Sequence, residues 1–202
     1  MKRRLLITAV AVLVLSLAAY GTLAYLTGST TAHNVITSGS VKIELLDKTD
    51  KGGEIGKVDF PSEGLKVMPG TTASKEVSVK NLSSECWVRV KLVKEINLAN
   101  EAQLSSNAAD PVSLEPNLGT SEDRWTLGND GYYYYNSPLA KNAETSKLFT
   151  TVTFDPGMGN EYQNAKLTIQ VYAEAVQTAN NPIPDGGNVT QVAGWPSTPT
   201  PV

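Results

Sequence analysis

The side chains that most often carry out catalysis or bind transition metals are few in this chain. The 202 residues include one histidine, His33, and one cysteine, Cys86. A zinc site of the usual kind needs several histidine or cysteine ligands, and a serine protease triad needs a histidine beside its nucleophile. The sequence contains no H-E-x-x-H pair, no G-x-S-x-G motif and no G-x-x-x-x-G-K-[ST] loop. We therefore expect no enzyme activity and no cofactor.

Carboxylates are numerous enough to stand close together by chance, as Glu54 and Asp59 do, or Glu122 and Asp123. We interpret both pairs as solvated loop charges and predict no metal ligands among them. Oxygen ligands for calcium are also present in the loops at residues 129–130 and 155, but their spacing does not resemble an EF-hand loop. An oxygen-only metal site at these loops therefore stays open.

The single cysteine and the net charge argue against thiol chemistry, disulfide cross-linking and binding to polyanions. Cys86 stands next to Trp87 in an alternating segment, so we expect a small buried apolar residue rather than a reactive thiol. A single cysteine excludes an internal disulfide. The chain carries a net charge of −3, and −6 once the basic N-terminus is removed, which disfavours nucleic acid and anionic lipid as partners.

The N-terminus has the layout of a secretory signal peptide. Residues 2–4 read Lys-Arg-Arg and precede a charge-free apolar run over residues 5–19. Thr22 and Ala24 are small and spaced as signal peptidase requires, so we predict cleavage between Ala24 and Tyr25. The membrane would then be a partner only through the signal peptide before cleavage.

An uncleaved membrane anchor is the alternative, because the apolar run reaches about twenty residues when it is extended through Leu26. Cleavage leaves 178 of the 202 residues, enough for one sizeable domain with its own core. In either case we expect the folded part of the chain to lie outside the cell.

Apolar residues recur with period two along the body of the chain, which is typical of strands with one buried face. Turn sequences such as Asn129-Asp130-Gly131 and Asp155-Pro156-Gly157 separate them. The pattern predicts an all-β fold, an antiparallel β-sandwich of the jelly-roll type behind an N-terminal signal-peptide helix. The predicted strands cover residues 41–46, 76–80, 86–93, 132–135, 148–154 and 166–175.

Composition divides the chain into four parts. We predict a signal peptide over residues 1–24, an N-terminal arm over residues 25–40, the sandwich over residues 41–178 and a disordered or extended tail over residues 179–202. The tail is rich in proline, glycine and threonine, and proline at that density cannot join a strand ladder. Residues 96–123, rich in Asn, Ala, Ser and Glu, are predicted to be a loop insertion with one short helix.

The arm is a candidate donor strand. Residues 25–37 contain no proline and no formal charge apart from the titratable His33, so their backbone is able to pair with an exposed strand edge. Val35 and Ile36 are the candidate anchoring side chains. The alternative is a flexible N-terminal segment without a binding role, which is usual for termini rich in serine, threonine and glycine.

Three segments resemble the TasA/camelysin family. Residues 34–45, NVITSGSVKIEL, resemble the first strand of that family, N-x-[FI]-x-x-G-x-[LV]-x-[LI], which follows a signal peptide. Residues 67–81 are similar to its segment with Pro-Gly before K-x-[VF]-x-[VF]-x-N, and residues 166–177 are similar to its closing strand. The resemblance covers about residues 1–95 and 145–178, and the middle of the chain lies outside it.

The resemblance implies a secreted jelly-roll subunit of biofilm matrix fibres on the surface of a monoderm bacterium. The implied partners are further copies of the chain, whose sheet the arm would complete, and a SipW-type signal peptidase during export; a minor fibre subunit stays open. The label of camelysin-like relatives makes a metallopeptidase one alternative, for which His33 with Glu44 and other carboxylates is the only set of residues that could begin a metal site. A surface adhesin that uses the tyrosines of residues 132–135 is the other.

Overall fold

The computed structural model describes residues 26–29, 33–37, 41–51, 54–59, 65–98 and 110–196. The predicted signal peptide and the cleavage site at Thr22, Ala24 and Tyr25 lie outside these ranges. No helix within them is long and apolar enough to cross a membrane. The elements are β1 (Leu26–Ser29), β2 (His33–Thr37), β3 (Ile43–Lys51), β4 (Glu54–Asp59), β5 (Leu65–Val67), β6 (Thr72–Asn81), β7 (Cys86–Asn97), β8 (Val112–Leu114), β9 (Trp125–Leu127), β10 (Tyr132–Tyr135), β11 (Phe149–Phe154), η1 (Asn160–Tyr162), β12 (Lys166–Gln177) and η2 (Val189–Gln191).

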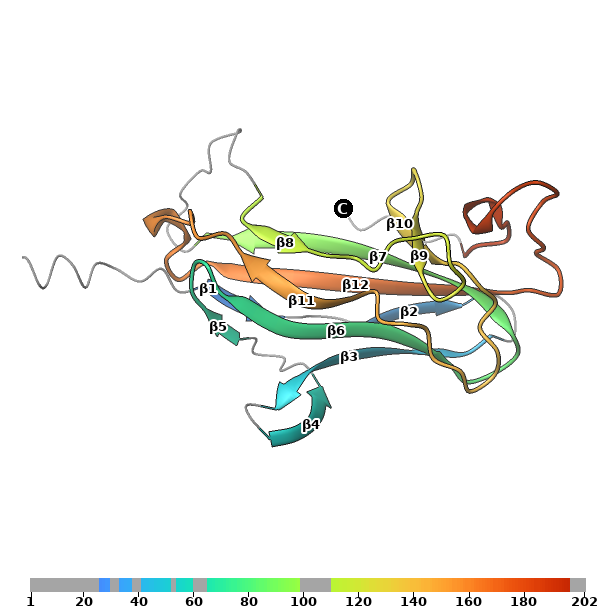
Figure 1. Cartoon of the computed structure of the whole chain (residues 1–202), viewed down its shortest axis with the longest axis horizontal. Helices are drawn as coiled ribbons and strands as arrows, with labels where there is room; N and C mark the ends of the chain where they lie inside the picture. The colour runs from blue at the N-terminus through green and yellow to red at the C-terminus, as the bar shows by residue number, and fades with distance from the viewer. Residues whose placement is uncertain are drawn as a thin grey trace, which may run out of the picture.

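The strands form two sheets that lie face to face (Figure 1). The seven-stranded sheet has the order β5-β1-β12-β7-β10-β9, with β2 also paired to β12. The five-stranded sheet has the order β4-β3-β6-β11-β8. Most pairs are antiparallel, so the prediction of an all-β, antiparallel protein is confirmed at this level.

The longest pair joins β7 and β12, which are antiparallel from Lys166 opposite Asn97 to Gln177 opposite Cys86. The other edge of β12 carries β1 and β2, and both run parallel to it. The sheet is therefore mixed at this edge. Parallel strands need a long crossover connection, and here the whole sandwich lies between the arm and β12.

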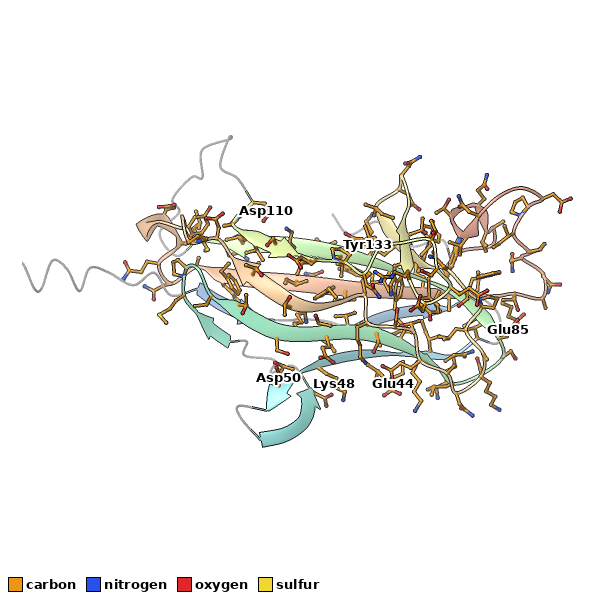
Figure 2. The ribbon with its side chains drawn as sticks, in the orientation of Figure 1. Glu44, Lys48, Asp50, Glu85, Asp110 and Tyr133 are labelled. Carbon is orange, nitrogen blue, oxygen red and sulfur yellow. The ribbon has the colours of Figure 1, made fainter. Side chains whose placement is uncertain are left out.

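The core lies between the two sheets and confirms the period-two prediction. On β3, Glu44, Lys48 and Asp50 lie along the outer side (Figure 2), whereas Ile43 and Leu45 are buried. The buried core side chains of the five-stranded sheet are Ile43, Leu45, Val77, Val79, Val112, Phe149, Val152 and Phe154, and those of β7 and β12 are Cys86, Val88, Val90, Leu167, Ile169, Val171, Ala173 and Ala175.

The prediction of a disordered tail from residue 179 is wrong for the described part, which extends to residue 196. A smaller apolar cluster forms on the outer face of the seven-stranded sheet. Val189 and Val192 are buried there beside Trp87 and Val176, and Trp195 packs against the cluster. Proline still keeps this segment out of the ladder, but its apolar side chains bury the outer face of the sheet instead.

The prediction of a loop insertion with a helix over residues 96–123 also needs correction. Within the described residues of this range, β7 extends to Asn97 and β8 is an edge strand of the five-stranded sheet. Val112 is fully buried and faces the core. A short Val-Ser-Leu alternation is enough for one more edge strand, and no described residue of the range is helical.

Candidate functional site

The arm-side edge of β12 is the first component of the site. β1 pairs with Lys166–Thr168 of β12, and β2 pairs with the stretch from Val171 to Ala175. We call this edge of β12 the acceptor edge. On the far side of β1 lies β5, whereas β12 is the only described strand that pairs with β2. Between them, the two arm strands pair with most of the acceptor edge.

Both candidate anchors lie in β2. Val35 pairs with Ala173 and Ile36 with Glu174. Val35 therefore shares the core-facing side of the sheet with Ala173, yet it remains 38% exposed because β2 is an edge strand. His33 lies two residues earlier, opposite Val171, so the histidine belongs to the paired arm.

The second component is a row of residues across the outer face of the seven-stranded sheet. Glu174 on β12 lies opposite Arg89 on β7, and Arg89 lies opposite Tyr134 on β10. Directly opposite residues in neighbouring strands place their side chains on the same face. The row thus connects the acceptor edge to the far side of the sheet.

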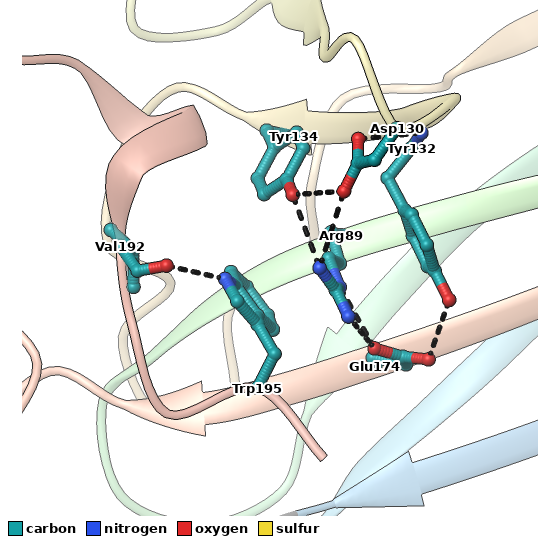
Figure 3. Close-up of polar contacts among 7 residues, drawn as sticks. All are labelled: Arg89, Asp130, Tyr132, Tyr134, Glu174, Val192 and Trp195. Carbon is teal, nitrogen blue, oxygen red and sulfur yellow. Dashed lines mark hydrogen bonds and ion pairs between the residues drawn. The ribbon is translucent and has the colours of Figure 1, made fainter. Parts of the chain in front are cut away.

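Arg89 is the centre of this row (Figure 3). Its Nε donates to Glu174 Oε2 at 2.8 Å, and its Nη2 lies 2.6 Å from the same oxygen. Its Nη1 donates to the Tyr134 hydroxyl at 3.1 Å and lies 3.5 Å from Asp130 Oδ2. The Tyr132 hydroxyl donates to the other Glu174 oxygen at 2.9 Å.

Aromatic rings surround the guanidinium. Its carbon lies 3.9 Å from the Tyr132 ring centroid and 4.6 Å from the Trp195 ring, distances at which cation–π attraction is effective. Trp195 also meets Tyr134 edge to face at 5.6 Å and donates from Nε1 to Val192 O at 2.8 Å (Figure 3). We call Arg89, Asp130, Tyr132, Tyr134, Glu174 and Trp195 the arginine cluster.

The electrostatics of the arginine cluster favour structure over reactivity. Glu174 is fully buried and Arg89 is 9% exposed. Burial acts to lower the pKa of Arg89, but hydrogen bonds to Tyr134 and Glu174 outweigh it and hold the pKa above its ordinary value. Burial raises the pKa of the Tyr134 hydroxyl. The Arg89 charge is paired closely with Glu174 and at a longer distance with the more exposed Asp130, and these contacts hold the outer face of β12 to β7 and β10.

The tyrosine run divides between the two faces, as strand alternation predicts. Tyr135 is in the main core and Tyr133 packs against it, while Tyr132 and Tyr134 belong to the outer cluster. Trp195 from the C-terminal segment packs on the outer pair. The tyrosines therefore act in packing, and the aromatic surface expected of an adhesin is covered here by the chain itself.

Of the carboxylates named in the sequence analysis, Asp59, Glu122, Asp123 and Asp155 have side chains that the structure describes. Asp59 forms an exposed ion pair with Lys48, and Asp155 accepts a hydrogen bond from the Gly157 backbone within its turn. Glu122 and Asp123 are exposed. Within the described part of the chain, no three His, Cys, Asp or Glu side chains converge as metal ligands would.

Cys86 is buried, as predicted. Its Sγ lies 4.0 Å from Leu139 O, and the residue belongs to the main core. Burial, with a smaller contribution from Glu85, raises the pKa of the thiol to about 12. A thiol of this kind is neutral and unreactive near neutral pH.

Sequence reasoning missed the arginine cluster and an ion pair in the core. Arg89 and Glu174 occupy outward positions of their strands, which usually face water, and nothing local indicates the cover by Trp195. Asp47 and Lys75 carried a usable signal, because they share the inward parity of Leu45 and Val77. A charged residue at a core position requires an explanation.

Comparisons with known proteins add no family to this geometry: no family model matches the chain, and neither a curated protein nor a solved structure does.

Proposed function

We propose that this chain is a secreted structural subunit of extracellular biofilm matrix fibres, and that subunits join by exchange of the N-terminal arm. In this proposal residues 1–24 are a signal peptide that a SipW-type peptidase removes, the two sheets form a jelly roll, and the arm of one copy occupies the acceptor edge of the next. The observation that carries the proposal is the parallel pairing of β1 and β2 with one edge of β12.

The position of the arm supports exchange. After the proposed cleavage the arm would come first in the chain, and the body follows it directly in the sequence from residue 41. Without the arm, the acceptor edge would present unpaired backbone N–H and C=O groups from Lys166 to Ala175, which is a template for pairing with another strand. The arm of a second copy has the same sequence and fits the same edge, as in domain swapping.

The remainder of the fold supports a passive building block. The body is held by a β7–β12 ladder with twelve residues in each strand and by a core that both sheets share. No observation on the described residues favours the metallopeptidase, since no group of three His, Cys, Asp or Glu among them is arranged to hold a metal ion. The covered tyrosines likewise give no support to the adhesin.

The test compares the chain from Tyr25 with a variant that lacks residues 25–36, both examined by electron microscopy over a range of protein concentrations. We expect unbranched filaments from the first and a folded monomer from the second. Fibres from the shortened variant that match those of the intact chain would exclude arm exchange.

A synthetic peptide of residues 25–40 provides the matched experiment. It should bind the shortened variant and block filament growth of the intact chain. A control peptide carries Val35→Pro and Ile36→Pro; successive N–H groups of a strand point to opposite sides, so the two prolines together remove a ladder donor. Equal binding of both peptides would contradict pairing at the acceptor edge.

A further inference from the structure

A lysine and an aspartate lie together in the core of the sandwich. Lys75 on β6 and Asp47 on β3 are 1% and 4% exposed, and Lys75 Nζ lies 2.5 Å from Asp47 Oδ2. Both side chains occupy inward positions of neighbouring strands. The β3–β6 register ends with Lys48 opposite Glu76, and its continuation by one residue places Thr49 opposite Lys75. Lysine and aspartate are almost never buried to this extent unless they are paired.

As an ion pair this arrangement is costly. Desolvation of two charges often exceeds their mutual attraction, unless further hydrogen bonds satisfy the remaining atoms. Here the second carboxylate oxygen, Asp47 Oδ1, is buried and has no hydrogen-bond partner among the described residues. The Asp47 carboxylate is therefore poorly compensated as the anionic half of a salt bridge.

The same environment favours reaction between the two groups. Burial lowers the pKa of the Lys75 ammonium, although the Asp47 carboxylate acts in the opposite direction. Proton transfer from Nζ to the carboxylate gives a neutral amine beside a neutral acid, and only a neutral amine is nucleophilic. Intramolecular reactions between well-oriented groups reach effective molarities of about 10⁵–10⁸ M, and the contact between Lys75 Nζ and Asp47 Oδ2 supplies the proximity that such a reaction needs.

We propose that Lys75 and Asp47 condense into an intramolecular isopeptide bond that links β6 to β3. A bond forms between Lys75 Nζ and Asp47 Cγ, and one bond between Cγ and a carboxylate oxygen breaks. That oxygen leaves as water with two of the three ammonium protons, and the third proton stays on the amide nitrogen. No oxidant or other reactant is needed, and both buried charges disappear.

The bond would give this chain a covalent cross-link, which a single cysteine cannot form within one chain. The chain has one cysteine and forms no internal disulfide. Residues 47 and 75 are separated by 28 positions in the sequence. A link between them closes a loop and reduces the entropy of the unfolded chain, as a disulfide would. This inference is independent of the proposed function, because it concerns the sandwich body and not the arm.

Peptide mapping tests the bond directly. The full chain is purified, unfolded, digested with trypsin and analysed by tandem mass spectrometry. We expect residues 43–48 joined to residues 67–80 through Asp47 and an uncut Lys75, with a mass lower by one water than that of the two peptides together. Recovery of residues 43–48 and 67–75 as separate peptides from folded protein, also after prolonged incubation, overturns the proposal.

The chain contains its own matched control. Lys48 and Asp59 form an ion pair with the same residue types and the same 2.5 Å separation, but their side chains are 33% and 86% exposed. This pair is exposed to solvent and not buried, so we expect no link between residues 48 and 59 in the same digest. Linkage at both pairs would show that proximity alone suffices and would contradict the role assigned to burial.

Lys75→Met provides a second measurement, because it retains an apolar stem without the amine. We expect loss of the linked peptide, slower migration in a denaturing gel and a lower melting temperature. The mapping of the unaltered chain decides the question even if this variant does not fold. An unaltered chain that migrates in the denaturing gel like folded Lys75→Met would also overturn the proposal.

Discussion

Glu174 lies opposite Ile36 in the parallel register of β12 and β2. On its other side the same residue lies opposite Arg89, and its buried carboxylate binds that guanidinium. The position at which the arm docks is therefore also the position that anchors the outer face of the sheet. Changes in the arginine cluster are expected to reach the acceptor edge through this residue.

Glu174→Ala should be strongly destabilising, because it leaves the Arg89 charge buried without its main partner. We expect a loss of about 3–5 kcal/mol in the free energy of unfolding, measured by urea denaturation. Asp59→Ala is the matched control, since it breaks an exposed ion pair and should cost less than about 1 kcal/mol. Similar losses from the two variants would contradict this account of the cluster.

Trp195→Ala should release the C-terminal segment. The variant loses the cation–π contact with Arg89 and the edge-to-face contact with Tyr134, so we expect a loss of about 1–3 kcal/mol. Limited proteolysis should then cut between residues 180 and 196 faster than in the unaltered chain. Trp195→Phe keeps an aromatic ring and should retain most of the protection; equal cleavage of both variants would count against ring stacking.

Cys86 should resist alkylation while the protein is folded. Because burial raises the pKa of its thiol to about 12 from an ordinary 9.0, the reactive thiolate is scarce near the ordinary pKa. Iodoacetamide labelling followed by mass spectrometry should show slow modification in buffer and fast modification in denaturant. Fast labelling of the folded chain would place the thiol at the surface.

Glu144 should contribute to stability above mildly acidic pH. Burial opposes its charge, but hydrogen bonds from Lys147 and Ser78 outweigh it and lower the pKa below 4.5. A carboxyl whose pKa is lower in the folded state adds stability above its unfolded pKa, and this stability disappears as the pH falls through the folded value.

The measurement for Glu144 is urea denaturation across this acidic range. Glu144→Gln should flatten the dependence of stability on pH there and cost less than about 1 kcal/mol at neutral pH, because its side chain is 37% exposed and solvent screens the pair. A variant that keeps the full slope would assign the effect to another carboxyl.

The strands themselves could be predicted from the sequence. The alternation of Val88 and Val90 with Trp87 and Arg89 gave both the strand and its two faces, because burial on a sheet follows the side-chain period. Pairing between distant segments could not be predicted in this way. The contact of residues 33–37 with residues 171–175 depends on backbone hydrogen bonds, which leave no periodic signature in either segment.

The candidate site was partly predictable for the same reason. The absence of charge and proline marked the arm as able to pair, but the choice of β12 and the parallel direction depend on the whole topology. The ordered C-terminal segment was missed because proline composition hid the contribution of Val189, Val192 and Trp195. The proline content correctly predicted that this segment would not join a strand ladder. It could not predict that three apolar side chains would pack the segment onto the outer face of the sheet.

The acceptor edge is already filled by the arm of the same chain, which has a kinetic consequence for assembly. A tethered strand acts at an effective concentration of about millimolar, so it outcompetes the arms of other copies for its own edge when those copies are well below that concentration. If subunits join by arm exchange as proposed, a molecule in this state would be a monomer that cannot accept the arm of another copy. The order of two events, closure of the arm on its own body and arrival of a second copy, would then decide between a dormant monomer and a fibre.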